Sequence, residues 1–588
     1  MSKLHRILIL GGTAYYILFV FLYNASVNMS YGDDVNVFLK QTLDWHYFWH
    51  RYLIWTSRLL IEIPLVFFAK HELAFRLCNM LVMLSLPVLL CKCLRMNGIK
   101  SFIVSMLCLS VYDVSYMESA GVRATFINYM WPLAALLAAQ ALLQAELDNP
   151  HKHKYWFFAA LSLLLFACNC EQVCLIACIT YPLAVIVCSL TRHKAYKIYL
   201  AYAVVALLEM IFILTCPGNT VRLHVETKSW LQAFADFDVL QKAFLGIVVT
   251  VNRYFFQCNT IIVALLGGLA LVQKTQRGKV FALIPLGCTL IVFVALGLFH
   301  VQMLHADSLA KENGLGKNGP PAVYFVEEEY LQFLALAYYV KPENGGLTRD
   351  TILADMDHYV SERKMTMEKE GLSAWAHYLK YGGNAGINPS NAFDTHAYLV
   401  AKTKAANAAG DRGQNASLWT PDKIQKAFVS NNITPLEHYL FYSGAGPFEV
   451  PGETVFPVPL ELRVKSVDSK QQNGTENFFY RVVRADIWPM FFSVAMCLYI
   501  VVSLYGASDT RQEFGFFLSI LVIAFCSRVA LGFSPMVFSA GDRTFLFLDF
   551  SILVVCAVLI RRLREPGLCL LALGSMVHTT QQLLRLYG

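Results

Sequence analysis

The chain has 588 residues, of which 56% are hydrophobic and only 15% are charged, and its formal net charge is +7 at pH 7. A soluble globular protein would carry about 25% charged residues, so this composition excludes an ordinary soluble protein. Apolar runs close to the length of a membrane span recur along the chain and predict a polytopic helical membrane protein. No zinc-finger spacing, nucleotide-binding glycine loop or basic–aromatic pattern is present, and we expect no nucleic-acid partner.

The N-terminal segment begins with the basic residues Lys3, His5 and Arg6, which precede an apolar run from Ile7 to about Tyr23. A cleaved signal peptide has the same layout. We favour an uncleaved first span, because many further apolar runs follow and no clear small-residue cleavage site is present. Basic residues before a span predict a cytoplasmic N-terminus, which puts the next segment on the outer face of the membrane.

An acidic doublet, Asp33 and Asp34, lies in the first predicted outer loop, residues 28–70. Carboxylates at the mouth of a membrane span are costly unless they have a task, so the doublet is a candidate site. Residues from about 36 to 70 mix Trp, His and Arg with apolar side chains. This composition predicts interfacial helices along the outer surface rather than another span.

The later loops alternate in charge along the chain. The basic loops contain Lys92 with Arg95 and Lys100, residues 151–154, residues 192–197, residues 274–279, and Arg561 with Arg562. The positive-inside rule predicts that these loops are cytoplasmic. The opposite span ends carry isolated arginines and acids within aromatic and apolar sequence. This pattern predicts a polar cavity on the outer face, and scattered structural ion pairs are the alternative.

A long polar insert, residues 305–484, interrupts the apolar pattern and contains no cysteine. We therefore predict three parts: a transmembrane core in residues 1–304, a soluble outer insert, and C-terminal transmembrane helices in residues 485–588. Disulfides cannot stabilise the insert, because it has no thiols to form them.

The insert contains a weak internal repeat, in which residues 374–382 align with residues 435–444. The repeat resembles the HYL-x-YG modules of bacterial exported and carbohydrate-related proteins, which form short helix–turn units. His377 and His438 occupy matching positions. Such a pair could bind a metal ion, but histidines in a repeat are more typical of its core.

Five stretches occur in an order that resembles a known superfamily. They are Asp33-Asp34, Trp55-Thr-Ser-Arg58, residues 119–132, Asn169-Cys-Glu171, and Pro217-Gly218-Asn219 followed by Arg222. Together they resemble the GT-C superfamily of membrane glycosyltransferases, in particular a poorly characterised bacterial branch akin to surface-polysaccharide glucosyltransferases. The resemblance implies an all-α GT-C-like core of about 12 to 13 spans with outer interfacial helices and a large, mostly helical insert. It places the chain in the bacterial cytoplasmic (inner) membrane, with the active site and insert extracytoplasmic.

The resemblance also implies an activity. GT-C enzymes take a monosaccharide from a polyprenyl-phosphate donor and attach it, with inversion, to a glycan or glycolipid acceptor. Such a displacement needs a carboxylate as general base and cations that stabilise the departing phosphate. Arginine suits the second task, because its planar fork binds phosphate oxygens bidentately. The implied partners are the lipid-linked donor, the acceptor and membrane lipids.

Candidate residues follow from these roles. The candidate general base is Asp33 or Asp34, with Asp33 favoured because the first acid of such a doublet is the usual base; Asp34 would then orient the acceptor or pair with an arginine. A helix cap is the structural alternative for this doublet. The candidate donor-phosphate ligands are Arg58, Arg123, Arg222, Arg253, Arg528 and Arg543. The candidate sugar or acceptor contacts are Glu118, Asn128, Tyr129, Trp131, Glu171 and Asn219.

Several of these side chains have structural alternatives. Arg58 and Glu62 are four residues apart and could pair on a helix. Asp542 could neutralise Arg543, and Glu171 could pair with an arginine. The aromatic candidates could be interfacial anchors.

The sequence predicts no cofactor and assigns no metal site. A divalent ion stays possible, because Asp33, Asp34, Asp113 and Glu118 could assemble a site for one.

Other functions are compatible with parts of the pattern. A polysaccharide polymerase or O-antigen ligase would share the outer arginines and many spans, but would less often begin with an acidic doublet. A lipid-linked-sugar transporter or flippase would place charges near the bilayer midplane and show duplicated halves. A non-enzymatic scaffold built around the insert would leave the doublet without a task.

Overall fold

The computed structural model describes residues 3–148, 154–193, 195–231, 234–235, 237–257, 259–298, 324–408, 418–431, 433–442, 456–465, 474–538, 540–563 and 565–587. These residues form helices and no β-strands. The chain divides into two compact units. The first contains Met1–Thr220, Val239–Met303 and Asp486–Gly588, and the second contains Val221–Asp238 and Leu304–Ala485. The predicted insert, residues 305–484, lies within the second unit.

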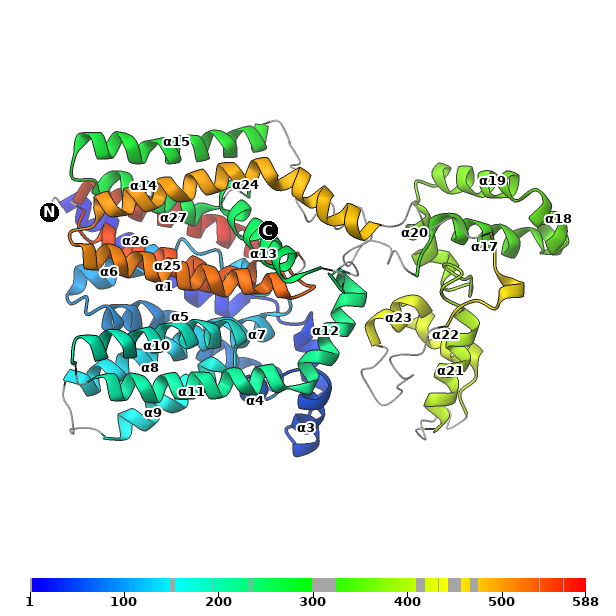
Figure 1. Ribbon diagram of the computed structural model, residues 1–588, viewed down its shortest axis with the longest axis horizontal. Helices are drawn as coiled ribbons and strands as arrows, with labels where there is room; N and C mark the ends of the chain where they lie inside the picture. Colours follow the sequence, from blue (N-terminus) through cyan, green and yellow to red (C-terminus); the bar gives the residue numbers. More distant parts are fainter. Residues whose placement is uncertain are drawn as a thin grey trace. The chain divides into compact units, whose positions relative to one another are not determined.

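The first unit is a bundle of long helices that run side by side (Figure 1). Nine helical segments of the described residues are long and apolar enough to cross a membrane. They are α1 (Lys3–Ser26), α5 (Glu72–Cys93), α7 (Val122–Thr125) continuing into α8 (Trp131–Asp148), α10 (Glu171–Leu190), α11 (Tyr196–Thr215), α15 (Gln276–Leu298), α24 (Gly474–Ala507), α25 (Arg511–Val529) and α26 (Leu546–Ile560). The bundle is therefore compatible with a multi-pass membrane protein.

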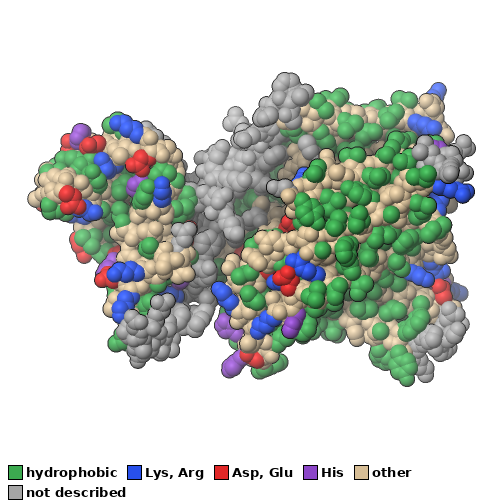
Figure 2. Space-filling view, turned by 180° about the vertical axis from the view of Figure 1, so that it is seen from behind, with side chains coloured by type: hydrophobic (Ala, Val, Ile, Leu, Met, Phe, Trp, Pro, Cys, Tyr) green, Lys and Arg blue, Asp and Glu red, His purple; other side chains and the backbone are tan. Residues whose placement is uncertain are grey.

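Further helices complete this bundle. The pair α13 (Val239–Phe256) and α14 (Thr260–Val272) is bent by 71° and makes a tenth crossing if it is one broken span. The shorter apolar helices α6 (Ile99–Leu109) and α9 (Lys154–Cys168) and the C-terminal α27 (Glu565–Tyr587) pack alongside. The predicted total of about 12 to 13 spans stays a prediction. Figure 2 shows one face of this unit, covered largely by apolar side chains.

The first loop after α1 folds into short helices. They are α2 (Asp33–Asn36), η1 (Phe38–Lys40), α3 (Trp45–Ile54) and α4 (Leu59–Lys70). None of them is long enough to cross a bilayer. Asp44 caps α3 by accepting a hydrogen bond of 2.7 Å from the backbone N–H of Tyr47, because a side-chain oxygen at this position satisfies an amide left unpaired by the helix.

The second unit is built from shorter helices. They are the end of α12 (Pro217–Trp230), α17 (Glu327–Tyr339), α18 (Arg349–Ala354), α19 (Met356–Lys369), α20 (Ala374–His377), α21 (Thr395–Ala408), α22 (Pro421–Ser430) and α23 (Pro435–Tyr442). The predicted boundary between residues 304 and 305, the basic residues 151–153 and 194, and Gly444 at the end of the repeat lie outside the described residues.

The first copy of the internal repeat begins earlier than the aligned motif. Phe325 packs on Tyr330 with ring centroids 5.2 Å apart, and Tyr378 lies 5.5 Å from the first ring and 5.4 Å from the second. The hydroxyl of Tyr330 lies 2.7 Å from Nδ1 of His377. Four side chains from α17, α20 and the turn after it thus form one aromatic cluster.

The second copy reproduces this cluster. Phe393, Tyr398 and Tyr439 have ring-centroid separations of 5.6, 5.2 and 5.6 Å, and the hydroxyl of Tyr398 lies 2.7 Å from Nδ1 of His438. Burial lowers the pKa of both histidines, that of His438 to about 3. The second unit therefore contains an internal duplication, in which His377 and His438 belong to the two aromatic clusters as neutral rings hydrogen-bonded to tyrosine.

Candidate active site

The acidic doublet is divided between two environments. The side chain of Asp34 is fully buried, and its oxygens accept hydrogen bonds from the backbone N–H groups of Arg123 at 2.9 Å and Ala124 at 2.7 Å. Asp34 thereby caps the N-terminus of α7, although the two are far apart in the sequence. Burial raises the pKa of Asp34 to about 6, although the two amide hydrogen bonds act in the opposite direction. This cap differs from the expected tasks of orienting an acceptor or pairing with an arginine side chain.

Asp33 is exposed, although its backbone is fixed. Its N–H donates to the carbonyl of Ala120 at 2.9 Å, and Gly32 (φ +64°) approaches that carbonyl so closely that a Cβ at Gly32 would lie 2.7 Å from its oxygen. The charge of Asp33 is felt by the guanidinium of Arg51 on α3. Of the two acids, Asp33 is the one that a ligand can reach.

Arg51 is itself held by a neighbouring helix. Its Nε donates to both oxygens of Glu62 at 3.0 Å, and the hydroxyl of Tyr47 donates to the same carboxylate at 2.8 Å. Glu62 therefore pairs with Arg51 and not with Arg58. The spacing of four residues was misleading, because α4 begins only at Leu59 and Arg58 precedes its first turn.

Two other predicted residues, Glu118 and Arg543, lie at the segment around Ala120, to which the backbone of Asp33 is hydrogen-bonded. Glu118, at the end of η2 (Val114–Glu118), accepts a hydrogen bond of 3.0 Å from the hydroxyl of Tyr23. Burial raises the pKa of its carboxyl group. Arg543, on η10 (Asp542–Phe545), donates to Oγ of Ser119 at 2.8 Å. Asp33 and Arg543, from two distant parts of the chain, thus contact the segment that contains Glu118, Ser119 and Ala120.

A second group of predicted residues gathers around Arg58. Its Nε donates to Glu171 at 2.7 Å, and its Nη1 donates to Oδ1 of Asn128 at 2.9 Å. The guanidinium carbon lies 5.7 Å from the ring centroid of Tyr129. Four side chains, from the residue before α4, the π-helical turn η3 (Phe126–Met130) and the first turn of α10, therefore meet, and Arg58 already has a carboxylate partner.

Asn219 supports this group indirectly. Its Nδ2 donates to Oγ of Ser57 at 3.2 Å and to the carbonyl of Ile213 at 2.8 Å. A Cβ on Gly218 would overlap the backbone N of Trp55. The Pro-Gly-Asn turn therefore packs against the segment before Arg58, rather than opening an anion site of its own.

The six predicted phosphate ligands differ in whether they have a counter-ion. The salt-bridged arginines are Arg58 with Glu171, Arg123 with Glu72, Arg222 with Glu226, and Arg253 with Asp542 and Asp549. Arg222 and Glu226 belong to the second unit, where they pair along α12. Within the described part of the chain, no carboxylate lies within salt-bridge distance of Arg528 or Arg543.

Trp131 lies in the bundle interior and not with the other predicted contacts. Its ring is stacked on Phe75 at a centroid distance of 6.2 Å, and its Nε1 donates to Oδ1 of Asn79 at 3.1 Å. Nδ2 of Asn79 donates in turn to Oδ1 of Asn24 at 2.9 Å. This relay joins α8, α5 and α1, so Trp131 takes part in helix packing, and its contact with a sugar stays a prediction.

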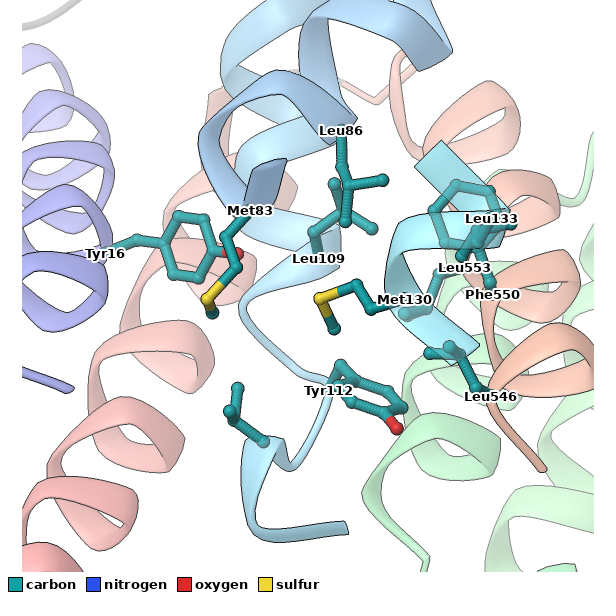
Figure 3. A pocket seen from close by; sticks show the side chains of 11 residues that line it. Tyr16, Met83, Leu86, Leu109, Tyr112, Met130, Leu133, Leu546, Phe550 and Leu553 are labelled. Carbon is teal, nitrogen blue, oxygen red and sulfur yellow. The ribbon is translucent and has the colours of Figure 1, made fainter. Parts of the chain in front are cut away.

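A small cavity lies inside the bundle (Figure 3). The thioethers of Met83 and Met130 project into it beside the ring of Tyr112, and the rest of the wall is mostly leucine and aromatic side chains. No charged residue lines it. The cavity therefore suits an apolar group and not a phosphate or a sugar.

Three acids that pair with the predicted arginines, Asp549, Glu72 and Glu226, were not predicted. Asp549 stands in the apolar run of α26, and an intramembrane carboxylate is itself a signal of function or of a buried pair. Glu72, at the start of α5, carries no such signal, because a glutamate in the first turn of a helix is common. In the described residues, no group of three or more His, Cys, Asp or Glu side chains is arranged to hold a metal ion.

Comparison of the chain with known protein families, with curated proteins and with solved structures found no match.

Proposed function

We propose that the chain is a membrane glycosyltransferase that moves a monosaccharide from a polyprenyl-phosphate donor to a glycan or glycolipid acceptor. The observation that supports this proposal best is the division of labour in the doublet. Asp34 is committed to the cap of α7, whereas Asp33 is exposed on the backbone that this cap immobilises. A general base must be accessible and placed beside the acceptor, and an exposed carboxylate on a fixed backbone meets both needs.

The proposed reaction uses Asp33 and Arg543. Asp33 takes the proton of the acceptor hydroxyl, and the acceptor oxygen bonds to the anomeric carbon as the bond to the donor phosphate breaks. The phosphate leaves with the bonding electron pair, and Arg543 stabilises its charge. The Ser119 loop, which Arg543 contacts at 2.8 Å, lies directly beside the Asp33 backbone. The network of Arg58, Asn128 and Glu171 shapes the neighbouring wall.

In this proposal, the doublet faces the extracytoplasmic side of a bacterial inner membrane and the N-terminus is cytoplasmic. The basic loops of the sequence support this orientation. Cysteine accessibility tests it: a cysteine at Asn36 should react with an impermeant maleimide in intact cells, and one at Asn97 only after the cells are opened. The reverse pattern would contradict the orientation.

The activity test compares three acid-to-amide variants in lipid nanodiscs. Asp33→Asn should lose transfer from a radiolabelled polyprenyl-phosphate hexose by roughly a hundredfold or more, while its melting temperature stays that of the wild type. Asp34→Asn should lower the melting temperature, because the amide nitrogen cannot accept from a backbone N–H. Asp44→Asn, which removes an exposed acid of the same loop, is the control and should keep transfer. Full transfer by Asp33→Asn would refute the base assignment.

A further inference from the structure

Arg253 and Arg528 are both buried, but only one of them has acidic partners. The exposed fraction is 3% for Arg253 and 2% for Arg528. Nε of Arg253 donates to Asp542 at 2.7 Å and its Nη1 donates to Asp549 at 3.1 Å. In the described residues, Nε and Nη1 of Arg528 and Nη2 of Arg253 have no hydrogen-bond partner. Three buried N–H-bearing nitrogens of two adjacent cations are therefore unsatisfied.

The sequence brings the two arginines together through glycine contacts. A Cβ on Gly246 of α13 would overlap the carbonyl oxygen of Val529, and one on Gly532 would overlap that of Lys242. Only glycine lets the backbones of α13 and of η9 (Ala530–Phe533), which follows α25, approach this closely. The contact holds α13, which carries Arg253, against the end of α25, which carries Arg528.

Phe545 sets the separation of the two side chains. Each guanidinium carbon lies 4.0 Å from the ring centroid of Phe545, so the two carbons are within about 8 Å of each other, twice that distance. The cation–π contacts offset part of the cost of burying Arg528. They do not satisfy its N–H groups, which would otherwise cost several kcal/mol in a dry site.

We infer that Arg528, together with the unused Nη2 of Arg253, binds a phosphate group. A carboxylate presents two oxygens in one plane and suits a single guanidinium, whereas the tetrahedral oxygens of a phosphate can accept from two guanidinium groups at once. N–H···O distances of about 2.8 Å to a shared phosphate are compatible with guanidinium carbons up to about 8 Å apart. Asp542 and Asp549 keep Arg253 in place and leave its third nitrogen for the ligand.

This phosphate site does not depend on the proposed sugar transfer. A phosphate would bind here in a transferase, a ligase or a lipid flippase alike, because the argument concerns only buried N–H groups. Two sources share the chemistry: free inorganic phosphate, and the phosphate of a polyprenyl lipid presented from the bilayer. Loss of binding in an Arg528 variant and loss of transfer in Asp33→Asn are separate results, so either idea can fail alone.

The test is calorimetric titration of the detergent-solubilised protein in phosphate-free buffer. One series uses sodium phosphate and the other uses polyprenyl phosphate in the same detergent. We expect the wild type to bind at least one titrant, and Arg528→Met to bind it roughly tenfold or more weakly. Tighter binding of polyprenyl phosphate would identify the lipid as the source, and equal binding would identify the phosphate group alone. Absence of binding in both series would overturn the site.

Two further variants show whether a loss of phosphate binding comes from the lost side chain or from misfolding. Arg528→Lys keeps the charge but loses the planar fork, so it should remain folded and bind more weakly than the wild type. Arg76→Met is the control: Arg76 is partly buried and donates to Glu72 at 2.7 Å and to the carbonyl groups of Asn24 and Val27, so its loss should leave phosphate binding unchanged. Without ligand, Arg528→Met should melt no lower than the wild type, whereas Arg76→Met should melt lower. Wild-type binding by both Arg528 variants, or a lower melting temperature of ligand-free Arg528→Met, would refute the inference.

Discussion

The loop that contains Asp33 and Asp34 (the acidic loop) and the pair of buried arginines Arg253 and Arg528 (the arginine cluster) each hold two like charges. The two regions compensate these charges in opposite ways. In the loop, the buried acid Asp34 is fully hydrogen-bonded and its neighbour Asp33 is exposed. In the cluster, Arg253 and Arg528 are both buried. The carboxylates of Asp542 and Asp549 both accept hydrogen bonds from Arg253. Burying a charge without partners is costly. The loop therefore exposes one carboxylate at no such cost, whereas in the described residues the cluster leaves Nε and Nη1 of Arg528 and Nη2 of Arg253 without a hydrogen-bond partner.

Of the changes predicted for these two regions, removal of the Arg253 side chain should lower the free energy of unfolding most. Arg253→Met leaves the carboxylate of Asp549, which is fully buried, without its cation. Breaking a buried pair in this way costs about 3–5 kcal/mol, so the free energy of unfolding measured in SDS should fall by that amount. The double variant Arg253→Met/Asp549→Asn should recover part of the loss. A single variant as stable as the wild type would show that the cluster is not an ion-pair network.

A glycine that packs against the acidic doublet, Gly121 at the start of α7, should give the next largest effect. Gly121 has φ +105°, and a Cβ there would lie 2.9 Å from Cγ of Asp34. Gly121→Ala combines a strained backbone with a clash against the capping carboxylate, so we expect a loss of about 1–3 kcal/mol together with a loss of transfer. Gly98→Ala is the control, because it has φ +95° but nothing within 4 Å of its Cβ. Equal effects of the two changes would mean that backbone strain alone matters at Gly121.

The sequence predicts the local features of these regions and misses the long-range ones. The apolar runs reveal the spans, and the doublet at the end of the first span marks the loop. That Asp34 caps α7 could not be predicted, because its partners lie 89 and 90 residues away. For Arg58 the sequence left two alternatives open, a phosphate ligand or a pair with Glu62, and for Glu171 it left open a sugar contact or a pair with an arginine. Arg58 pairs with Glu171, which is distant in sequence and close only after α10 has packed. Tertiary contacts decide the counter-ions of Arg58, Arg123 and Arg253, whereas Arg222 pairs locally with Glu226, four residues away.

The two acids of the doublet should differ in their effect on stability. Asp34→Ala removes both hydrogen bonds of the α7 cap and should cost about 1–2 kcal/mol. Asp33→Ala removes an exposed side chain and should change the free energy of unfolding by about 0.5 kcal/mol or less. SDS unfolding of both variants measures the difference. Equal losses would contradict the division of labour on which the proposed base rests.

The smallest expected effect is a pH dependence that comes from Asp34. Its carboxyl, with Arg123 and Asp33 as the neighbouring charges, has a pKa raised from 3.8 to about 6 in the folded protein, chiefly by burial. The folded state therefore holds this proton more tightly than the unfolded state, and the free energy of unfolding falls as the pH rises through the interval between these values. From pH 5 to pH 7, the contribution of one such group is on the order of 1 kcal/mol. Asp34→Asn cannot titrate, so its stability should decline less over this range than that of the wild type. Parallel pH profiles would mean that the buried carboxylate is already ionised at pH 5, with its two amide hydrogen bonds outweighing burial.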